Sequence, residues 1–115
     1  MSLPQVSSLT VQELAQKLQQ EGSQLQLIDV REPEELALAS IPGFQNFPLS
    51  QFPYWYNTIC QTLDPTKETL VLCHHGIRSA RVCAVLINLG FQQVKNIAGG
   101  IDAYAREIDP TVGRY

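Results

Sequence analysis

The chain has 115 residues, of which 44% are hydrophobic, so it is long enough for one compact domain with a single core and too short for two. Its formal net charge of −3 excludes the broadly basic surface by which proteins bind nucleic acid or anionic lipid. No apolar run is as long as a membrane span, and Met1–Gln5 lacks the basic start and apolar core of a secretory signal. We therefore expect a single cytoplasmic domain over residues 1–115, with neither nucleic acid nor a membrane as partner.

The chain has three cysteines at irregular spacing, an odd number that argues against a disulfide framework. No Cys-x-x-Cys pair is present, which argues against a zinc site, and no cofactor is expected. Free thiols in a reducing compartment fit this pattern. Cys60 and Cys83 each lie among apolar residues, so we predict that both pack in the core, with an exposed thiol as the alternative for Cys60.

The first elements are predicted from helix caps and hydrophobic spacing. Thr10 and Glu13 have the spacing of a capping box, and apolar residues follow at helical intervals until Gly22 offers a stop. Residues 25–30 form a short apolar run that is typical of a buried parallel strand. A proline then opens a short helix over residues 33–38.

The second half of the chain continues the alternation of strand and helix. Its predicted elements are a turn at 41–44, a brief strand at 45–48, a helical stretch at 49–63, a strand at 69–72, a helix at about 79–89, a strand at 94–97 and a final helix from Gly99-Gly100 through Ile108. Such alternation predicts an α/β fold with a mostly parallel central sheet of about five short strands and helices on both faces.

Ligands of open parallel sheets gather at the carboxyl ends of the strands. Asp29 and Cys73 both stand at the ends of predicted strands. We therefore expect both residues at one edge of the sheet.

The stretch Cys73–Ser79 places a thiol where a strand ends and a helix begins. Free backbone N–H groups and the helix dipole favour an anion at such a junction. A helix N-terminus with nearby cations lowers the pKa of a cysteine thiol from ~8.5 into a range of about 3.5–7.5, and the thiolate is the nucleophile. Gly76 allows backbone N–H groups to turn inward, and Arg78 offers a planar fork for an oxyanion. The pattern predicts a cysteine nucleophile in an anion-binding loop.

A resemblance to a known family rests on these residues. The pattern Cys-x-x-Gly-x-Arg-Ser at residues 73–79, preceded by Leu27–Pro33 and followed by Gly99–Ile101, resembles the rhodanese (thiosulfate sulfurtransferase) homology domain. The resemblance runs nearly end to end and is similar to the single-domain members. It implies a single rhodanese-like domain in which one cysteine takes a sulfane sulfur from a donor, forms a persulfide and passes the sulfur to a thiophilic acceptor.

The resemblance also assigns roles to residues of this chain. Cys73 is implied as the catalytic residue that carries the persulfide. Asp29 is implied to support the loop, and Arg31 to be structural or to line the entrance. The implied cradle for the terminal sulfur and the leaving group comprises His74, His75, Gly76, Ile77, Arg78 and Ser79.

The partners implied are a small-molecule sulfur donor such as thiosulfate and a thiol or cyanide acceptor, with a protein sulfur acceptor as a further option. One alternative is a non-enzymatic persulfide carrier or an interaction module. A cysteine phosphatase or arsenate reductase is the least favoured alternative, because cysteine phosphatases use Cys-x5-Arg and only four residues separate Cys73 from Arg78 here.

Several structural alternatives remain open at this point. Arg78 could form a surface ion pair, which would contribute little to stability. Asp29 and Arg31 are as suited to structural pairing as to substrate contact. His74 and His75 could ligate a metal, but no further ligand has suitable spacing in the sequence, so we predict no metal site.

Overall fold

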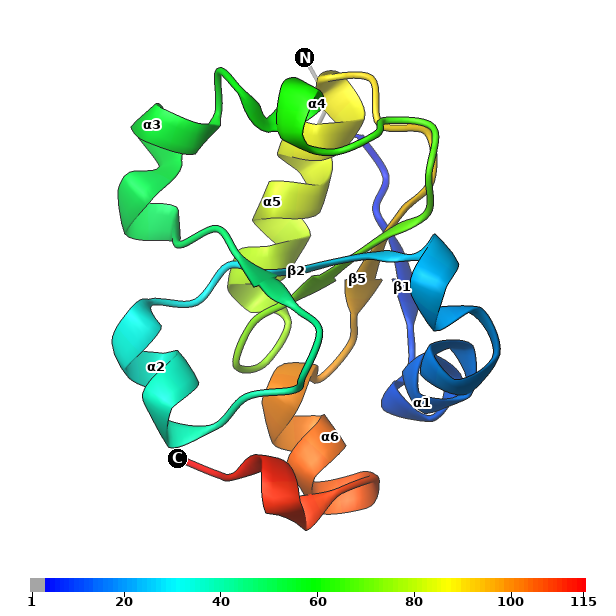
Figure 1. The fold of residues 1–115 in the computed structure, drawn as a ribbon, viewed down its shortest axis with the longest axis vertical. Coiled ribbons are helices and arrows are strands. Elements are labelled where there is room, and N and C mark those ends of the chain that lie inside the picture. Colours follow the sequence, from blue (N-terminus) through cyan, green and yellow to red (C-terminus); the bar gives the residue numbers. More distant parts are fainter. Residues whose placement is uncertain (1–3) are drawn as a thin grey trace.

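The computed structural model describes residues 4–115, and its centre is a five-stranded sheet in which the strands lie side by side in the order β1-β5-β4-β2-β3 (Figure 1). All paired strands are parallel. The strands are β1 (Ser7–Leu9), β2 (Gln26–Asp29), β3 (Gln45–Asn46), β4 (Thr69–Leu72) and β5 (Val94–Ile97). The predicted α/β fold with a sheet of about five short strands is confirmed, and the sheet is wholly parallel.

Five α-helices in the described residues lie between the strands, and a sixth follows the last strand: α1 (Val11–Glu21), α2 (Pro33–Leu38), α3 (Phe52–Trp55), α4 (Ile59–Thr62), α5 (Ile77–Asn88) and α6 (Gly100–Glu107). Short 3-10 turns lie at Gly22–Gln24, Leu49–Gln51 and Pro110–Val112. The predicted capping box is present, because Thr10 accepts from the backbone of Glu13 and the Glu13 side chain accepts from the backbone of Thr10.

The two faces of the sheet bury separate apolar clusters because side chains alternate along each strand. On β4, Leu70 and Leu72 face the cluster that contains α1 and α6 residues, whereas Val71 faces the cluster built with α4 and α5. Cys73 continues this alternation and belongs to the α5 side. Figure 1 shows α1 and α6 on one side of the sheet and α3, α4 and α5 on the other.

The structure differs from the sequence prediction in three places. Strand β1 was not predicted, because only Leu9 of its three residues is buried and no alternation is visible over so short a run. Residues 49–63 form a 3-10 turn and two separate four-residue helices rather than one helical stretch. Helix α5 begins at Ile77, two residues earlier than predicted, so more of the cysteine loop belongs to the helix.

The register of the sheet places the predicted site residues together. Asp29 pairs with Leu72, the residue directly before Cys73, so both side chains lie at the carboxyl edge of the sheet as expected. None of the helices in residues 4–115 is long and apolar enough to cross a membrane. Residues 1–3, which form part of the N-terminal stretch considered for a secretory signal, lie outside the described part of the chain.

Candidate active site

The sulfur of Cys73 is held inside the loop between β4 and α5. The backbone N–H of Gly76 donates to Cys73 Sγ over 3.0 Å, and the hydroxyl oxygen of Ser79 lies 3.2 Å from the same sulfur. Cys73 is buried, with 1% of its surface exposed. A buried sulfur that receives a backbone N–H at a helix N-terminus is suited to carry negative charge.

Gly76 makes this turn possible. Its φ is +96°, a left-handed conformation that residues with a Cβ rarely adopt, and it is the N-cap residue directly before α5. Asn96 of β5 secures the same turn, because its amide donates to the Gly76 carbonyl over 3.0 Å and accepts from the Ser79 hydroxyl over 2.5 Å. The loop is therefore bound to the neighbouring strand as well as to its own helix.

Helix α6 holds the other side of the loop. The N–H groups of Ile101 and Asp102 donate to the carbonyls of Cys73 and His74 over 2.9 and 3.1 Å. These N–H groups are among those that a helix N-terminus leaves free. The close approach requires Gly100, because a Cβ there would overlap both carbonyl oxygens, with Cys73 O at 2.5 Å.

Arg78 forms an ion pair with Glu35 of α2. Both terminal nitrogens take part, with Nη1 donating to Oε2 and Nη2 donating to Oε1, each over 2.8 Å. The hydrogen bond from Arg78 lowers the pKa of Glu35 to about 2, and the same bond raises the pKa of Arg78. The pairing that the sequence left open is thus present, and the Arg78 side chain is 36% exposed.

Asp29 and Arg31 form a buried ion pair beneath the site. Arg31 Nη2 lies 2.7 Å from Asp29 Oδ2, and the Arg31 side chain has no exposed surface. Its other terminal nitrogen donates to Tyr115 Oη over 3.0 Å. Arg31 is therefore fully buried and paired, and the Asp29 carboxylate accepts hydrogen bonds from Arg31.

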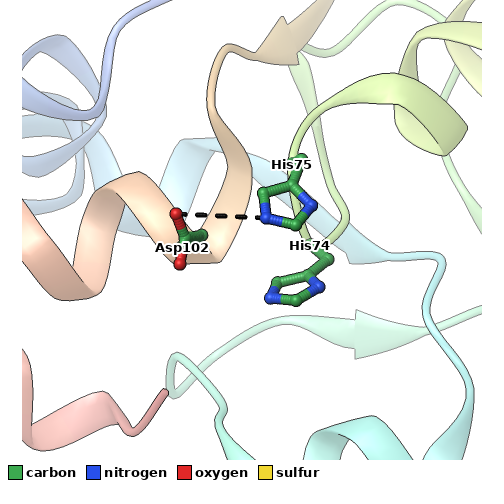
Figure 2. A group of neighbouring side chains, drawn as sticks. All are labelled: His74, His75 and Asp102. Carbon is green, nitrogen blue, oxygen red and sulfur yellow. Dashed lines mark ion pairs between the residues drawn. The ribbon is translucent and has the colours of Figure 1, made fainter. Parts of the chain in front are cut away.

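His74, His75 and Asp102 gather on the outer side of the loop (Figure 2). Their potential ligand atoms lie within 4.8 Å of one another, so the fold supplies the third group that the sequence spacing did not. Asp102 is already engaged, since Arg106 donates to it over 3.0 Å and Arg114 lies at 3.9 Å. Two guanidiniums beside the carboxylate disfavour a metal cation, and we propose none here.

The remaining predicted residues have contrasting positions. The side chain of Ile77 is 69% exposed, so only its place at the start of α5 belongs to the loop. Cys83 is buried as predicted, and burial raises the pKa of its thiol to about 12. The prediction for Cys60 was wrong: it is exposed, because residues 49–63 break into short helices and leave it on the outer side.

Three residues of the site were not found from the sequence: Glu35, Asn96 and Tyr115. Gly100 was noted there only as part of the Gly99–Ile101 motif and as the start of the last helix. Glu35 carries a local signal, since it lies in the first turn of α2 and closes a capping box with Glu32. Its contact with Arg78 spans 43 residues and has no local signal. Asn96 and Tyr115 likewise reach the site only through the fold of the whole chain.

Two large surface hollows, of about 410 and 570 Å³, lie away from the loop. The first is lined by residues such as Glu21 and Lys67, and the second lies between α1 and α6. Neither contains a cysteine or a histidine. The chemistry of the chain therefore points to the Cys73 loop, where the thiol and its hydrogen-bond donors meet.

Comparison with known proteins agrees with this geometry. The chain is 46% identical over 112 residues to the Rhodanese-like/PpiC domain-containing protein 12, chloroplastic, of Arabidopsis thaliana, covering 96% of this chain and 38% of that protein. It is 34% identical over 106 residues to the Putative sulfurtransferase YtwF of Bacillus subtilis, covering 92% of this chain and 97% of that protein. The chain therefore spans less than half of the Arabidopsis relative and nearly all of the Bacillus one.

A solved structure and a family comparison complete the assignment. The crystal structure of a rhodanese-related protein from Thermoplasma volcanium superposes with a TM-score of 0.74 at 30% identity, covering 89% of this chain and 93% of that one. The family described as Rhodanese-like domain matches residues 10–107. The matched range includes β2, the whole cysteine loop and α6. The chain belongs to the rhodanese-like domain family.

Proposed function

We propose that the protein is a sulfurtransferase that moves a sulfane sulfur through a persulfide on Cys73. The observation that carries the proposal is the position of the Cys73 sulfur, which receives the Gly76 N–H over 3.0 Å at the start of α5. A thiolate so placed is stabilised by a fixed donor and by the helix dipole. The name of the Bacillus relative, a putative sulfurtransferase, supports the same reaction class.

The reaction divides into two displacements at sulfur. The Cys73 thiolate attacks the outer sulfur of a donor such as thiosulfate; the new Sγ–S bond forms, the S–S bond of the donor breaks, and sulfite leaves with the electron pair. An acceptor such as cyanide or a thiolate then attacks the terminal sulfur. The Sγ–S bond breaks, the Cys73 thiolate is regenerated, and thiocyanate or a new persulfide leaves. Neither step needs an oxidant or a reductant.

Arg78 can bind the anionic part of the donor while it remains paired with Glu35. The guanidinium carries five N–H donors, and the Glu35 pair uses one hydrogen on each terminal nitrogen. The Nε–H and one terminal N–H point in the same direction and form a second pair of donors. This pair fits two oxygens of an oxyanion. The buried position of Cys73 suits a small donor better than a bulky one.

Mass spectrometry of the intact protein tests the proposal directly. Incubation with thiosulfate should add one sulfur mass, and the Cys73→Ser variant should lose both the adduct and thiocyanate formation from cyanide. Cys60→Ser is the matched control, because Cys60 is exposed and stands outside the loop, and it should load as the native chain does. Full activity of the Cys73→Ser variant would refute the assignment.

A persulfide carrier for a partner protein is the second candidate. The Arabidopsis relative supports it, since there the matching region is one part of a longer protein named for an additional PpiC domain. A carrier would form the adduct readily, turn over poorly with cyanide and transfer its sulfur rapidly to one protein thiol. A Cys73-dependent hydrolysis of aryl phosphate would instead point to a phosphatase, which the short loop disfavours.

A further inference from the structure

Tyr115 contacts three parts of the site at once. Its hydroxyl accepts from Arg31 Nη1 over 3.0 Å and donates to Glu35 Oε1 over 2.8 Å. Its ring stacks on His74 with centroids 3.9 Å apart and planes at 9°. Its main-chain oxygen lies 3.1 Å from His74 Nε2. One residue therefore joins the end of β2, helix α2 and the cysteine loop.

The anchor of the Tyr115 hydroxyl is rigid. Arg31 has no exposed surface and is fixed by the Asp29 carboxylate and by the Ala39 carbonyl, to which it donates over 2.9 Å. The Tyr115 hydroxyl accepts a hydrogen bond from this fixed guanidinium. Its own proton is donated in a hydrogen bond to Glu35. The position of the Glu35 carboxylate therefore depends, through Tyr115, on the position of the buried Asp29–Arg31 pair.

The Glu35 carboxylate is bound on both oxygens. Oε1 accepts from Arg78 and Tyr115, and Oε2 accepts from Arg78 and from the backbone N–H of Glu32. A carboxylate held at four points fixes the plane of the guanidinium that it pairs with. The direction of the free Arg78 fork therefore depends on Glu35, and through it on Tyr115.

His74 is the second group that Tyr115 orders. Burial lowers the pKa of His74, and the charge of His75 acts in the same direction, while the Tyr115 main chain, Asp102 and Glu35 oppose them. The ring lies between two neighbours, with Tyr115 and His75 each at a centroid distance of 3.9 Å. Stacking between these two rings holds the His74 imidazole in place beside Cys73.

We propose that Tyr115 is a positioning residue of the donor site, which orients the free fork of Arg78 through Glu35 and fixes the His74 ring at the mouth of the Cys73 loop. The inference rests on the proposed function in taking the donor to be an anion. Tyr115 touches no reacting atom, so its effect falls on the affinity for an anionic donor rather than on the displacement at sulfur.

Two substitutions separate the hydroxyl from the ring. Tyr115→Phe removes both hydrogen bonds and keeps the stack, and Tyr115→Leu removes both features. Loss of one hydrogen bond of ordinary net strength corresponds to a fold-change of about fivefold. Both hydrogen bonds of the Tyr115 hydroxyl act on the donor only through Glu35 and Arg78, so Tyr115→Phe should raise the KM for thiosulfate by about that factor, with kcat within about twofold. Tyr115→Leu should raise KM further. Tyr54→Phe is the control, because Tyr54 is 76% exposed on α3.

Alkylation of Cys73 measures the same effect without any sulfur transfer. In a Cys60→Ser background, the rate of Cys73 alkylation is measured with anionic iodoacetate and with neutral iodoacetamide. The ratio of the first rate to the second reports how strongly the surroundings of Cys73 favour an anionic reagent. Both Tyr115 variants should lower this ratio by about threefold or more. In parallel, the pKa of His74 followed by NMR should rise in Tyr115→Leu, because the covering ring is lost, and stay unchanged in Tyr115→Phe.

The outcomes distinguish the two proposals. An unchanged KM and an unchanged alkylation ratio in both variants would overturn the role of Tyr115, whatever the protein transfers. A ratio that falls in a protein that never acquires a sulfur adduct would refute the sulfurtransferase and keep the positioning role. A Tyr115→Phe variant that lowers thermal stability but leaves KM and the ratio at native values would show a purely structural residue.

Discussion

The guanidinium of Arg31 lies 2.7 Å from the carboxylate of Asp29, and both side chains are buried at the carboxyl end of β2. A buried ion pair contributes little net stability, but removing one partner leaves an uncompensated charge in a medium of low dielectric. The pair also determines where the Tyr115 hydroxyl and the Ala39 carbonyl lie. A buried charged pair at the carboxyl end of β2 thus positions its neighbours Tyr115 and Ala39.

Arg31→Met should therefore destabilise the fold strongly. The Asp29 carboxylate would lose its cationic partner, and we expect a loss of about 3–5 kcal/mol in the free energy of unfolding, measured by urea denaturation. The double variant Asp29→Leu/Arg31→Met removes both charges and should lose less than the single variant. A single variant as stable as the native chain would contradict this account of the pair.

Glu35 should make stability depend on pH in acid. Its pKa is about 2 in the folded chain against an ordinary value of 4.5, so the unfolded chain binds the proton more readily. The stabilisation is fully present above about pH 4.5 and is lost as the pH falls toward 2. Because the pair is partly exposed, we expect its size to be on the order of 1 kcal/mol.

Two glutamine variants on α2 test this pH dependence of stability, one at Glu35 and one at the neighbouring Glu34. Glu35→Gln should flatten the decline of stability below pH 4.5, followed by urea midpoints at successive pH values. Glu34→Gln, at an exposed neighbouring position, should leave the decline as in the native chain. Equal profiles for the two variants would show that the Arg78 pair does not hold Glu35 charged in the folded state.

Gly100→Ala should disrupt the support of the cysteine loop. The added Cβ would overlap the carbonyls of Cys73 and His74 at a φ of +62°, and we expect a loss of about 2–4 kcal/mol in the free energy of unfolding. Gly22→Ala is the matched control, because Gly22 has helical φ and ψ and a methyl group there would meet no neighbouring atom within 4 Å. That variant should gain about 0.4–1 kcal/mol. Equal thermal stability of the two variants would contradict the close packing of α6 on the loop.

The three thiols should differ in reactivity. Cys83 has no exposed surface and burial raises the pKa of its thiol to about 12, so iodoacetamide at neutral pH should leave it unlabelled in the folded chain. Peptide mapping should find adducts on Cys60 and Cys73, and a third adduct only after denaturation in urea. A labelled Cys83 in the folded chain would show that the core around α5 opens readily.

Local patterns in the sequence predicted the elements that make local contacts. The capping box at Thr10 located α1, and the apolar run before Cys73 located β4, because caps and hydrophobic periodicity act over a few residues. The break of residues 49–63 was missed, since Trp55 and Ile59 pack into the core through tertiary contacts that periodicity does not encode.

The candidate site shows the same division. Cys73, Gly76 and Arg78 stand in one short segment, so the sequence alone predicted a loop between a strand and a helix that brings a thiol and a glycine turn together. The partner of Arg78 was not predictable, because Glu35 lies on another helix and the pair forms only when the sheet brings α2 and α5 together. The sequence left Arg31 open between a structural role and a place at the entrance, and only the fold reveals that it is fully buried.

The binding of two loop carbonyls by α6 has a consequence for how this site can diversify. A trans peptide directs its N–H opposite to its C=O, so the amides that follow the carbonyls of Cys73 and His74 turn away from α6. The direction in which the N–H groups of the cysteine loop point is thus set by the main chain. Side chains at His74, His75 and Ile77 can therefore change without altering the backbone N–H of Gly76 that contacts the Cys73 sulfur.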